Sequence, residues 1–454
     1  MNSSPTEAEL RRRVAELLVV RASGHLEDRQ RRYPRWELTN ADLQRLLEQG
    51  VGGVILLGGS AAELRQRTHQ LQAWAPQPLL LCADVEEGVG QRFEGASWLV
   101  PPLALGRLHQ RRPSVALALA ERYGRCTGDQ ARRCGLNWVL GPVCDVNNNP
   151  ANPVINVRAW GEDPETAGLL AAAFQAGLRL AGVLGCAKHF PGHGDTSSDS
   201  HLDLPVLPHT RERLDAIELP PFQRLIAAGI DAVMTAHLLL PELDPQQPAT
   251  LSGAVLTDLL RRDLGFDGLV VTDALVMEAI ADRYGPGEAA ALAFEAGADL
   301  ILMPADVAAA LDALETGFAS GRWPIERLEE SLRRREQALE ASQSSPSQVT
   351  NSLKQLAELQ RAHHGLQQEL LQASLEHQGG QLSAEGGVNL IRVDNSLQCP
   401  ALPLNAPALI RPRSAGWRPW RIDDHSPPWE LPQQKVLLHL QIVVIISVPF
   451  LFQL

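Results

Sequence analysis

Apolar, β-branched runs alternate with amphipathic stretches along the first two thirds of the chain. The predicted strands are Gly53–Leu57, Leu79–Ala83, Trp138–Leu140, Val183–Ala187, Ala232–Ala236, Leu269–Thr272 and Leu300–Met303. The predicted helices between them are Ala61–Trp74, Val115–Cys134, Pro164–Ala181, Arg211–Ala228 and Gly287–Ala296. Strand, helix and strand at this spacing indicate βαβ units and a parallel sheet.

The seven predicted strands favour an α/β fold of the (β/α)8 TIM-barrel type, with one strand missed or irregular. A doubly wound open sheet is the alternative. The glycine-rich segment 50–53 precedes the first predicted strand, and no GxGxxG follows that strand. The dinucleotide-binding fingerprint of a doubly wound sheet is therefore absent.

Residues 1–341 are predicted to form the barrel, which the charged amphipathic helix Ile325–Ser342 could close. A linker rich in Ser, Gln and Pro is predicted over residues 342–350. Residues 351–454 are predicted to hold a helix, Ser352–Leu375, and a partial α/β region of unknown role that begins with the strand Gly387–Val393.

The last residues, from Val436 to Leu454, are nearly all apolar. They suit either a marginal membrane anchor or one or two buried strands of a domain that stops early. Pro449 and the β-branched run Ile442–Val448 favour strands. A truncated end would also account for them.

Charge and cysteine content narrow the class of protein. The chain has 454 residues and a formal net charge of −12, without a long basic run, so nucleic acid is not an expected partner. The six cysteines form no CxxC pair, and Cys82, Cys144 and Cys186 lie in strand-like runs. Buried reduced thiols and a start without a long apolar segment indicate a cytoplasmic protein.

The segment 188–201 carries the densest chemistry, with three histidines, two aspartates and a lysine among glycines. It follows the apolar run 182–187, so a polar, sharply turned loop after a buried strand is predicted. Lys188 is one of only three lysines in the chain. Either chance explains this in an arginine-rich sequence, or the site is too tight for a guanidinium group.

Polar residues also follow four other predicted strands. Because the carboxyl ends of parallel strands meet at one end of a barrel, we expect these residues to share one pocket. The residues at these strand ends are Asp84, Glu86, Arg92, Asp145, His237 and Asp273.

Four segments resemble the motifs of one family, in the same order and with compatible spacing. The stretch Lys188–His201 is similar to the signature of family 3 glycoside hydrolases, in the branch of the bacterial β-N-acetylhexosaminidases. The chain departs from the family at Val89, where an arginine is usual. The other matching segments are Asp84–Phe93, Asn152–Arg158 with Trp160–Pro164, and Val271–Met277.

The resemblance implies a role for each matching residue. Asp273 would be the nucleophile, His201 the general acid/base and Asp199 its carboxylate partner. The competing interpretations are a helix N-cap for Asp273 and a locally hydrogen-bonded loop residue for His201. Neither a cofactor nor a metal is implied. The implied sugar-binding residues are Asp84, Arg92, Arg158, Lys188 and His189.

The predicted function is a retaining β-N-acetylhexosaminidase that releases terminal β-linked N-acetylglucosamine, with peptidoglycan fragments as the implied substrates. A phosphorylase is an alternative, because a spent histidine acid is neutral and repels an incoming phosphate less than a carboxylate would. The residues are also compatible with a family 3 β-glucosidase, with a metallohydrolase that uses the histidines of the segment 188–201, and with a non-catalytic carbohydrate-binding protein. The oligomeric state is not predicted.

Overall fold

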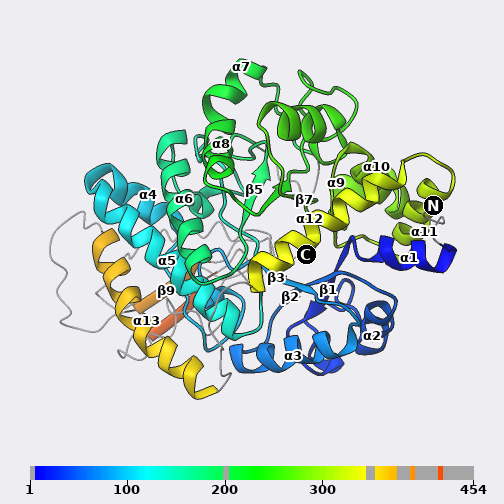
Figure 1. The fold of residues 1–454 in the computed structure, drawn as a ribbon. Helices are drawn as coiled ribbons and strands as arrows, with labels where there is room; N and C mark the ends of the chain where they lie inside the picture. The colour runs from blue at the N-terminus through cyan, green and yellow to red at the C-terminus, as the bar shows by residue number, and fades with distance from the viewer. Residues whose placement is uncertain (1–5, 198–203, 344–352, 376–388, 394–417, 423–454) are drawn as a thin grey trace. The chain divides into compact units, whose positions relative to one another are not determined.

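The computed structural model describes residues 6–197, 204–343, 353–375, 389–393 and 418–422 (Figure 1). The chain divides into two compact units, Met1–Ser374 and Leu375–Leu454. The first unit carries all of the candidate site and is described first.

Eight parallel strands form the centre of the first unit. Two runs of hydrogen-bonded neighbours, in the orders β4-β3-β2-β1-β8 and β5-β6-β7, are joined by bridges between Trp138 and Leu184 and between Val271 and Leu300. The ring is therefore closed, and the predicted (β/α)8 barrel is confirmed. The strands are β1 (Leu18–Ser23), β2 (Gly53–Leu57), β3 (Leu80–Ala83), β4 (Trp138–Val139), β5 (Cys186–Phe190), β6 (Ala232–Thr235), β7 (Leu269–Val271) and β8 (Ile301–Leu302).

Two strands differ substantially from the sequence-based prediction, and the others agree with it to within one residue at each end. The missing strand is β1, which precedes all seven predicted ones. Strand β5 begins at Cys186 rather than Val183 and continues to Phe190, so Lys188 and His189 lie within the strand and not in the loop after it. The extension arises because the backbone of Lys188 pairs with Pro142 and Cys144 beyond the end of β4.

Helices surround the barrel (Figure 1). Several begin at side-chain caps that the sequence provides, such as Ser60 before α3 and Asp163 before α6. The helix predicted over Arg211–Ala228 is interrupted by a π-helical turn, Leu214–Glu218. The helices are α1 (Glu7–Ala15), α2 (Asn40–Glu48), α3 (Ala61–Trp74), α4 (Pro102–Arg111), α5 (Pro113–Arg133), α6 (Pro164–Leu180), α7 (Arg211–Arg213), α8 (Leu219–Ala227), α9 (Glu278–Tyr284), α10 (Pro286–Ala296), α11 (Val307–Ala319), α12 (Ile325–Gln343) and α13 (Leu353–Ser374), with a π-helix at Ala254–Asp263.

Strand residues alternate between two apolar layers. Val54 and Leu56 of β2 belong to the large core cluster between the strands and the helices, whereas Ile55 between them does not. Because successive side chains point to opposite faces, Ile55 faces the barrel interior. Burial on both faces explains why the strands are continuous apolar runs in the sequence.

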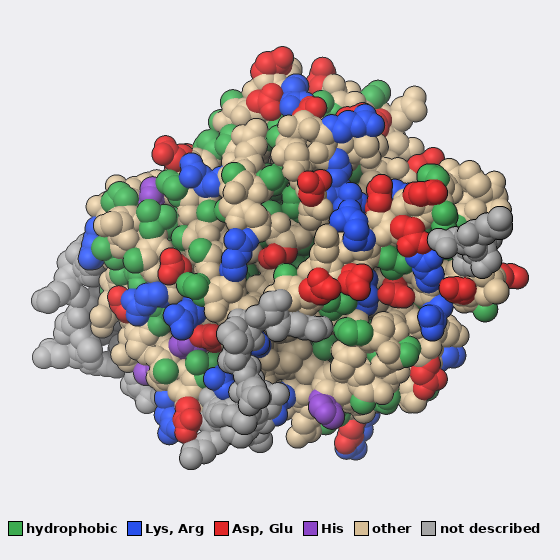
Figure 2. Space-filling view, in the orientation of Figure 1, with side chains coloured by type: hydrophobic (Ala, Val, Ile, Leu, Met, Phe, Trp, Pro, Cys, Tyr) green, Lys and Arg blue, Asp and Glu red, His purple; other side chains and the backbone are tan. Residues whose placement is uncertain are grey.

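Helix α12 covers the amino-terminal ends of the strands. Arg335 donates hydrogen bonds to the carbonyls of Gly52 and Pro78, directly before β2 and β3. Arg327 and Arg334 bind Asp299 just before β8. Acidic and basic side chains are interspersed over the face that Figure 2 shows. The polar residues that follow the strands lie at the other end of the barrel, opposite the end that α12 covers.

In the second unit, β9 (Asn389–Val393) pairs in parallel with β10 (Arg418–Ile422). The apolar residues 436–454 lie outside the described residues. Within the part of the chain that the structure describes, no helix has the length and apolar character to cross a membrane. The predicted domain boundaries, 1–341, 342–350 and 351–454, stay predictions; α13 packs against α4 and α5 within the first unit.

Candidate active site

Lys188 joins two carboxylates at the carboxyl end of the barrel. Its Nζ lies 2.7 Å from Oδ1 of Asp84 and 2.6 Å from Oε1 of Glu86. The lysine side chain is 1% exposed, whereas Asp84 retains 22% exposure. Burial would lower the pKa of Lys188, but the two carboxylates raise it, so the lysine stays charged. Asp84 therefore has one oxygen held by Lys188 and a face open to solvent.

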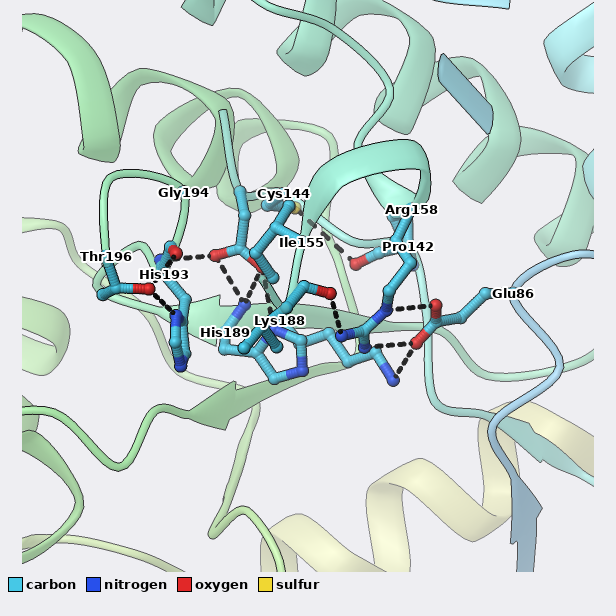
Figure 3. Close-up of polar contacts among 12 residues, drawn as sticks. Glu86, Pro142, Cys144, Ile155, Arg158, Lys188, His189, His193, Gly194 and Thr196 are labelled. Carbon is cyan, nitrogen blue, oxygen red and sulfur yellow. Dashed lines mark hydrogen bonds and ion pairs between the residues drawn. The ribbon is translucent and has the colours of Figure 1, made fainter. Parts of the chain in front are cut away.

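Arg158 binds the same Glu86 in a bidentate manner. Its Nε and Nη2 each lie 2.8 Å from a carboxylate oxygen of Glu86, and its Nη1 donates to the carbonyl of Val154 (Figure 3). Burial would raise the pKa of Glu86, but Arg158 and Lys188 hold it well below its usual value. Arg158 thus binds Glu86 with the planar fork that suits carboxylates, and its role in sugar binding stays a prediction.

Asp145 organises the histidines of β5 and the loop after it. Its Oδ2 lies 2.7 Å from Nδ1 of His189, and its Oδ1 accepts the backbone N–H of His193 at 2.7 Å. Burial would raise the pKa of Asp145, but the interactions with His189 and His193 lower it. The pairing fixes the ring of His189 at the end of the barrel where Lys188 and Asp84 lie.

His193 has a shaping role in the loop. Its Nδ1 bonds Oγ1 of Thr196, and Asn152 donates to the carbonyls of His193 and Gly194 (Figure 3 shows the loop residues). Burial lowers the pKa of His193 to about 4, so the ring is neutral near pH 7. At Gly194 a Cβ atom would lie 1.8 Å from the carbonyl oxygen of Val146, so only glycine fits there.

Asp273 follows β7 at the same end. Its side chain is partly exposed between the buried Thr272 and Ala274, and its charge acts on His193. Its Oδ1 accepts the N–H of Ala274 at 2.7 Å. The next helix, α9, begins at Glu278 with Met277 as its N-cap residue. Asp273 is therefore not the helix N-cap that was its competing interpretation.

The segment that carries Asp199 and His201 lies outside the described residues. The chain before and after it is described. Asp195 and His209 bond each other at 3.0 Å across this segment. Arg92 follows Asp84 and donates from Nε to the carbonyl of Asp84 at 2.9 Å.

Two acidic residues that bind Lys188, Arg158 and His189 were not among the predicted site residues. Glu86 and Asp145 follow predicted strands, and their position at a strand end was the signal in the sequence. Their partners, Lys188, Arg158 and His189, come from distant segments. Pattern alone therefore could not give their role in positioning the cluster.

Among the described residues, Asp195, His209 and Glu218 have ligand atoms within 4.8 Å of one another. The guanidinium group of Arg213 lies between two of them, 3.2 Å from Asp195 and 3.1 Å from Glu218. A cation is thus already supplied by the chain. Of the three histidines of the metallohydrolase alternative, His189 is paired with Asp145 and His193 with Thr196, and His201 lies outside the described residues.

Comparison with known proteins identifies the family. Residues 9–337 match the glycosyl hydrolase family 3 N-terminal domain. The chain belongs to glycosyl hydrolase family 3. The match covers the whole barrel, including the motifs at the ends of β3, β5 and β7, and it confirms the family that these motifs indicated.

Sequence relatives of this family 3 chain carry the name of the predicted branch. The chain is 34% identical over 331 residues to "Beta-hexosaminidase A" of Pseudoalteromonas piscicida, covering 68% of this chain and 53% of that protein. It is 38% identical over 271 residues to "Beta-hexosaminidase" of Stenotrophomonas maltophilia (strain K279a), covering 59% of this chain and 80% of that protein. The chain spans about half the length of the first relative.

Solved structures agree with the family 3 assignment. A family 3 beta-N-acetylglucosaminidase from Paenibacillus sp. has a TM-score of 0.75 at 33% identity, covering 93% of this chain and 80% of that one. Native NagZ from Neisseria gonorrhoeae has a TM-score of 0.61 at 31% identity, covering 77% and 97%. A beta-glucoside phosphorylase has a TM-score of 0.75 at 23% identity, covering 94% and 79%, and is similar in fold alone.

Proposed function

We propose that the protein is a retaining β-N-acetylhexosaminidase that releases terminal β-linked N-acetylglucosamine. The observation that carries the proposal is Asp273, a partly exposed carboxylate at the end of β7, in a family 3 barrel whose β3 and β5 present Asp84 and Lys188. The names of the relatives support the choice of sugar.

In this mechanism Asp273 attacks the anomeric carbon while His201 donates a proton to the leaving oxygen. The bond to the aglycone breaks and a covalent glycosyl-enzyme forms. His201, now neutral, takes a proton from water, and the resulting attack releases the sugar and restores Asp273. Asp199 orients His201 and favours its protonated form. Overall the configuration at the anomeric carbon is retained.

Asp84 accepts hydrogen bonds from sugar hydroxyls in this proposal. Lys188 and Arg92 keep its carboxylate in place through its side-chain oxygen and its backbone carbonyl, and His189 contacts the remaining polar groups of the sugar. The aglycone is inferred to be a peptidoglycan fragment in a cytoplasmic setting. A phosphorylase is the second candidate, because the proposed acid/base is a histidine and becomes neutral when spent.

Replacement of Asp273 by Ala tests the proposal. Turnover of a nitrophenyl β-N-acetylglucosaminide is expected to fall by several orders of magnitude, since the covalent step is lost. Asp267→Ala removes an exposed carboxylate just before β7 and serves as the matched control. Near-normal activity of the Asp273 variant would show that the nucleophile is misassigned.

The stereochemistry gives a separate measurement. Proton NMR of the first-formed sugar is expected to show the β-anomer, and an initial α-anomer would exclude the covalent mechanism. A repeat in phosphate buffer distinguishes the second candidate. A sugar 1-phosphate as the main product would identify a phosphorylase, and free N-acetylglucosamine a hydrolase.

A further inference from the structure

Helix α13 lies beyond the residues that match the family, yet it contacts the segment that leads to the candidate site. The family match ends at residue 337, whereas α13 spans Leu353–Ser374. It packs beside α4 and α5, as Figure 1 shows. Leu366 and Leu370 are buried in this packing, and Glu369 forms an ion pair with Arg122 of α5 at 2.7 Å.

A chain of hydrogen bonds runs from α13 to the end of β3. Nε2 of Gln367 donates to the carbonyl of Trp98 at 3.0 Å. The indole Nε1 of Trp98 donates to Oε2 of Glu87 at 2.7 Å. Glu87 directly follows Glu86, the carboxylate that holds Lys188 and Arg158. Trp98 therefore links α13 to Glu87, the residue next to Glu86 and its ion pairs.

A second route reaches the same segment one residue earlier. Nδ1 of His363 lies 3.5 Å from Nε2 of Gln130, and burial lowers the pKa of His363 to about 4, so its neutral ring can accept this hydrogen bond. Gln130 is buried and binds both the backbone N–H and the hydroxyl of Ser97. Gln130 thus links α13 to the residue next to Trp98.

The segment 84–99 is folded back on itself, so that backbone hydrogen bonds join its two ends. The N–H of Leu99 donates to the carbonyl of Glu87, and the N–H of Gly90 donates to the carbonyl of Ser97. At Gly88, with φ +87°, a Cβ atom would lie 2.6 Å from the carbonyl oxygen of Ser97. Trp98 and Glu87 are therefore coupled to the backbone that presents Asp84.

We propose that α13 is a positioning element of the sugar-binding site and that Gln367, Trp98 and Glu87 are its positioning residues. Docking of α13 holds Trp98, Trp98 holds Glu87, and these contacts fix the backbone that carries Asp84 and Glu86. The inference rests on the proposed function, in which Asp84 binds sugar hydroxyls. A helix that only covers an apolar patch would affect stability through Leu366 and Leu370 and would leave substrate binding unchanged.

Kinetics of Gln367→Ala and Trp98→Phe test the coupling. The second variant removes the indole N–H but keeps an aromatic ring. Both are expected to raise KM for a nitrophenyl β-N-acetylglucosaminide about fivefold, with kcat changed less than about twofold, because Asp84 contacts the sugar before and during the reaction. Gln368→Ala is the matched control, since Gln368 is exposed and bonds His364 on the same helix.

Hydrogen exchange gives the reciprocal measurement. If α13 docking favours sugar binding, sugar binding must favour α13 docking. Saturating N-acetylglucosamine is expected to slow amide exchange in residues 363–371 of the full chain, and Trp98→Phe is expected to reduce this protection. An unchanged KM in both variants, or sugar binding without slower exchange in α13, would overturn the inference and leave the proposed function standing. A wild-type protein that neither turns over the glycoside nor binds the sugar would overturn both.

Discussion

Lys188 shows how a single side chain can organise the end of the barrel. It is almost completely buried between two carboxylates, at distances that a compact ammonium group satisfies. The planar fork of Arg158 approaches Glu86 from another side. Two positive and two negative groups thus neutralise one another, which compensates for the loss of hydration that burial imposes.

His193 is expected to make the stability of the protein depend on pH. Burial lowers its pKa from 6.5 to about 4 in the folded state. Between these values the unfolded chain binds a proton that the folded chain does not, so stability falls as the pH falls through this range. One pKa unit corresponds to about 1.4 kcal/mol. Between pH 7.5 and 4.5, the unfolding free energy of His193→Gln should therefore fall by about 2–3 kcal/mol less than that of the wild type.

Urea unfolding at the two pH values measures this difference. His69→Gln, which changes an exposed histidine on α3, is the control and should keep the wild-type pH dependence. If the unfolding free energy falls equally in the His193 variant and the wild type, the folded protein binds a proton at His193 as readily as the unfolded chain does.

The sequence predicted which residues lie at the site better than it predicted what they contact. Asp84, Lys188, His189 and Asp273 could be located because each stands at the end of an apolar run. The ion pair between Glu86 and Arg158 joins residues 72 positions apart, and no local pattern specifies it. The roles of all of these residues in catalysis stay predictions.

At the scale of elements, the sequence predicted the bounds of a strand well where its apolar run is continuous. It predicted them less well where a charged residue interrupts the run or where hydrogen bonds to another segment set the end of the strand. Strand β2 and helix α3 have the predicted bounds, since β2 is a continuous apolar run and α3 begins after Ser60, whose side chain caps it. Strand β1 contains Arg21 in its middle, which interrupts its apolar pattern. The extent of β5 depends on hydrogen bonds to residues 142–144, and such non-local pairing is not written into the strand itself.

The loop after β5 also depends on one glycine. Gly194→Ala is expected to lower the unfolding free energy by about 2 kcal/mol and to reduce kcat/KM, because the new methyl group would overlap the carbonyl of Val146 and displace the loop. Gly253→Ala is the matched control, since nothing lies within 4 Å of the atom it adds and its φ is −62°. A Gly194 variant as stable and active as the control would show that the loop accommodates a side chain without moving.

At the scale of the whole molecule, buried cysteines on different elements can show whether the closed barrel unfolds in one step. Five cysteines, Cys82, Cys126, Cys134, Cys144 and Cys186, are free and buried in the described part of the chain. Burial raises the pKa of Cys126 and of Cys134 to about 12, so their thiolates are scarce at neutral pH. They lie on α5 and at its end, whereas Cys82 and Cys186 lie on β3 and β5.

If α5 and the strands unfold together, all five thiols should become reactive at one rate. A Cys399→Ser variant removes the remaining cysteine of the chain. A thiol reagent at pH 8 should then label none of the five quickly in the native protein, and labelling in rising urea should follow the loss of circular dichroism. Each thiol can be assigned by mass spectrometry of its peptide. Early labelling of Cys126 and Cys134 alone would instead show that α5 opens separately from the strands. That result would also bear on α13, because α5 is the surface against which α13 packs.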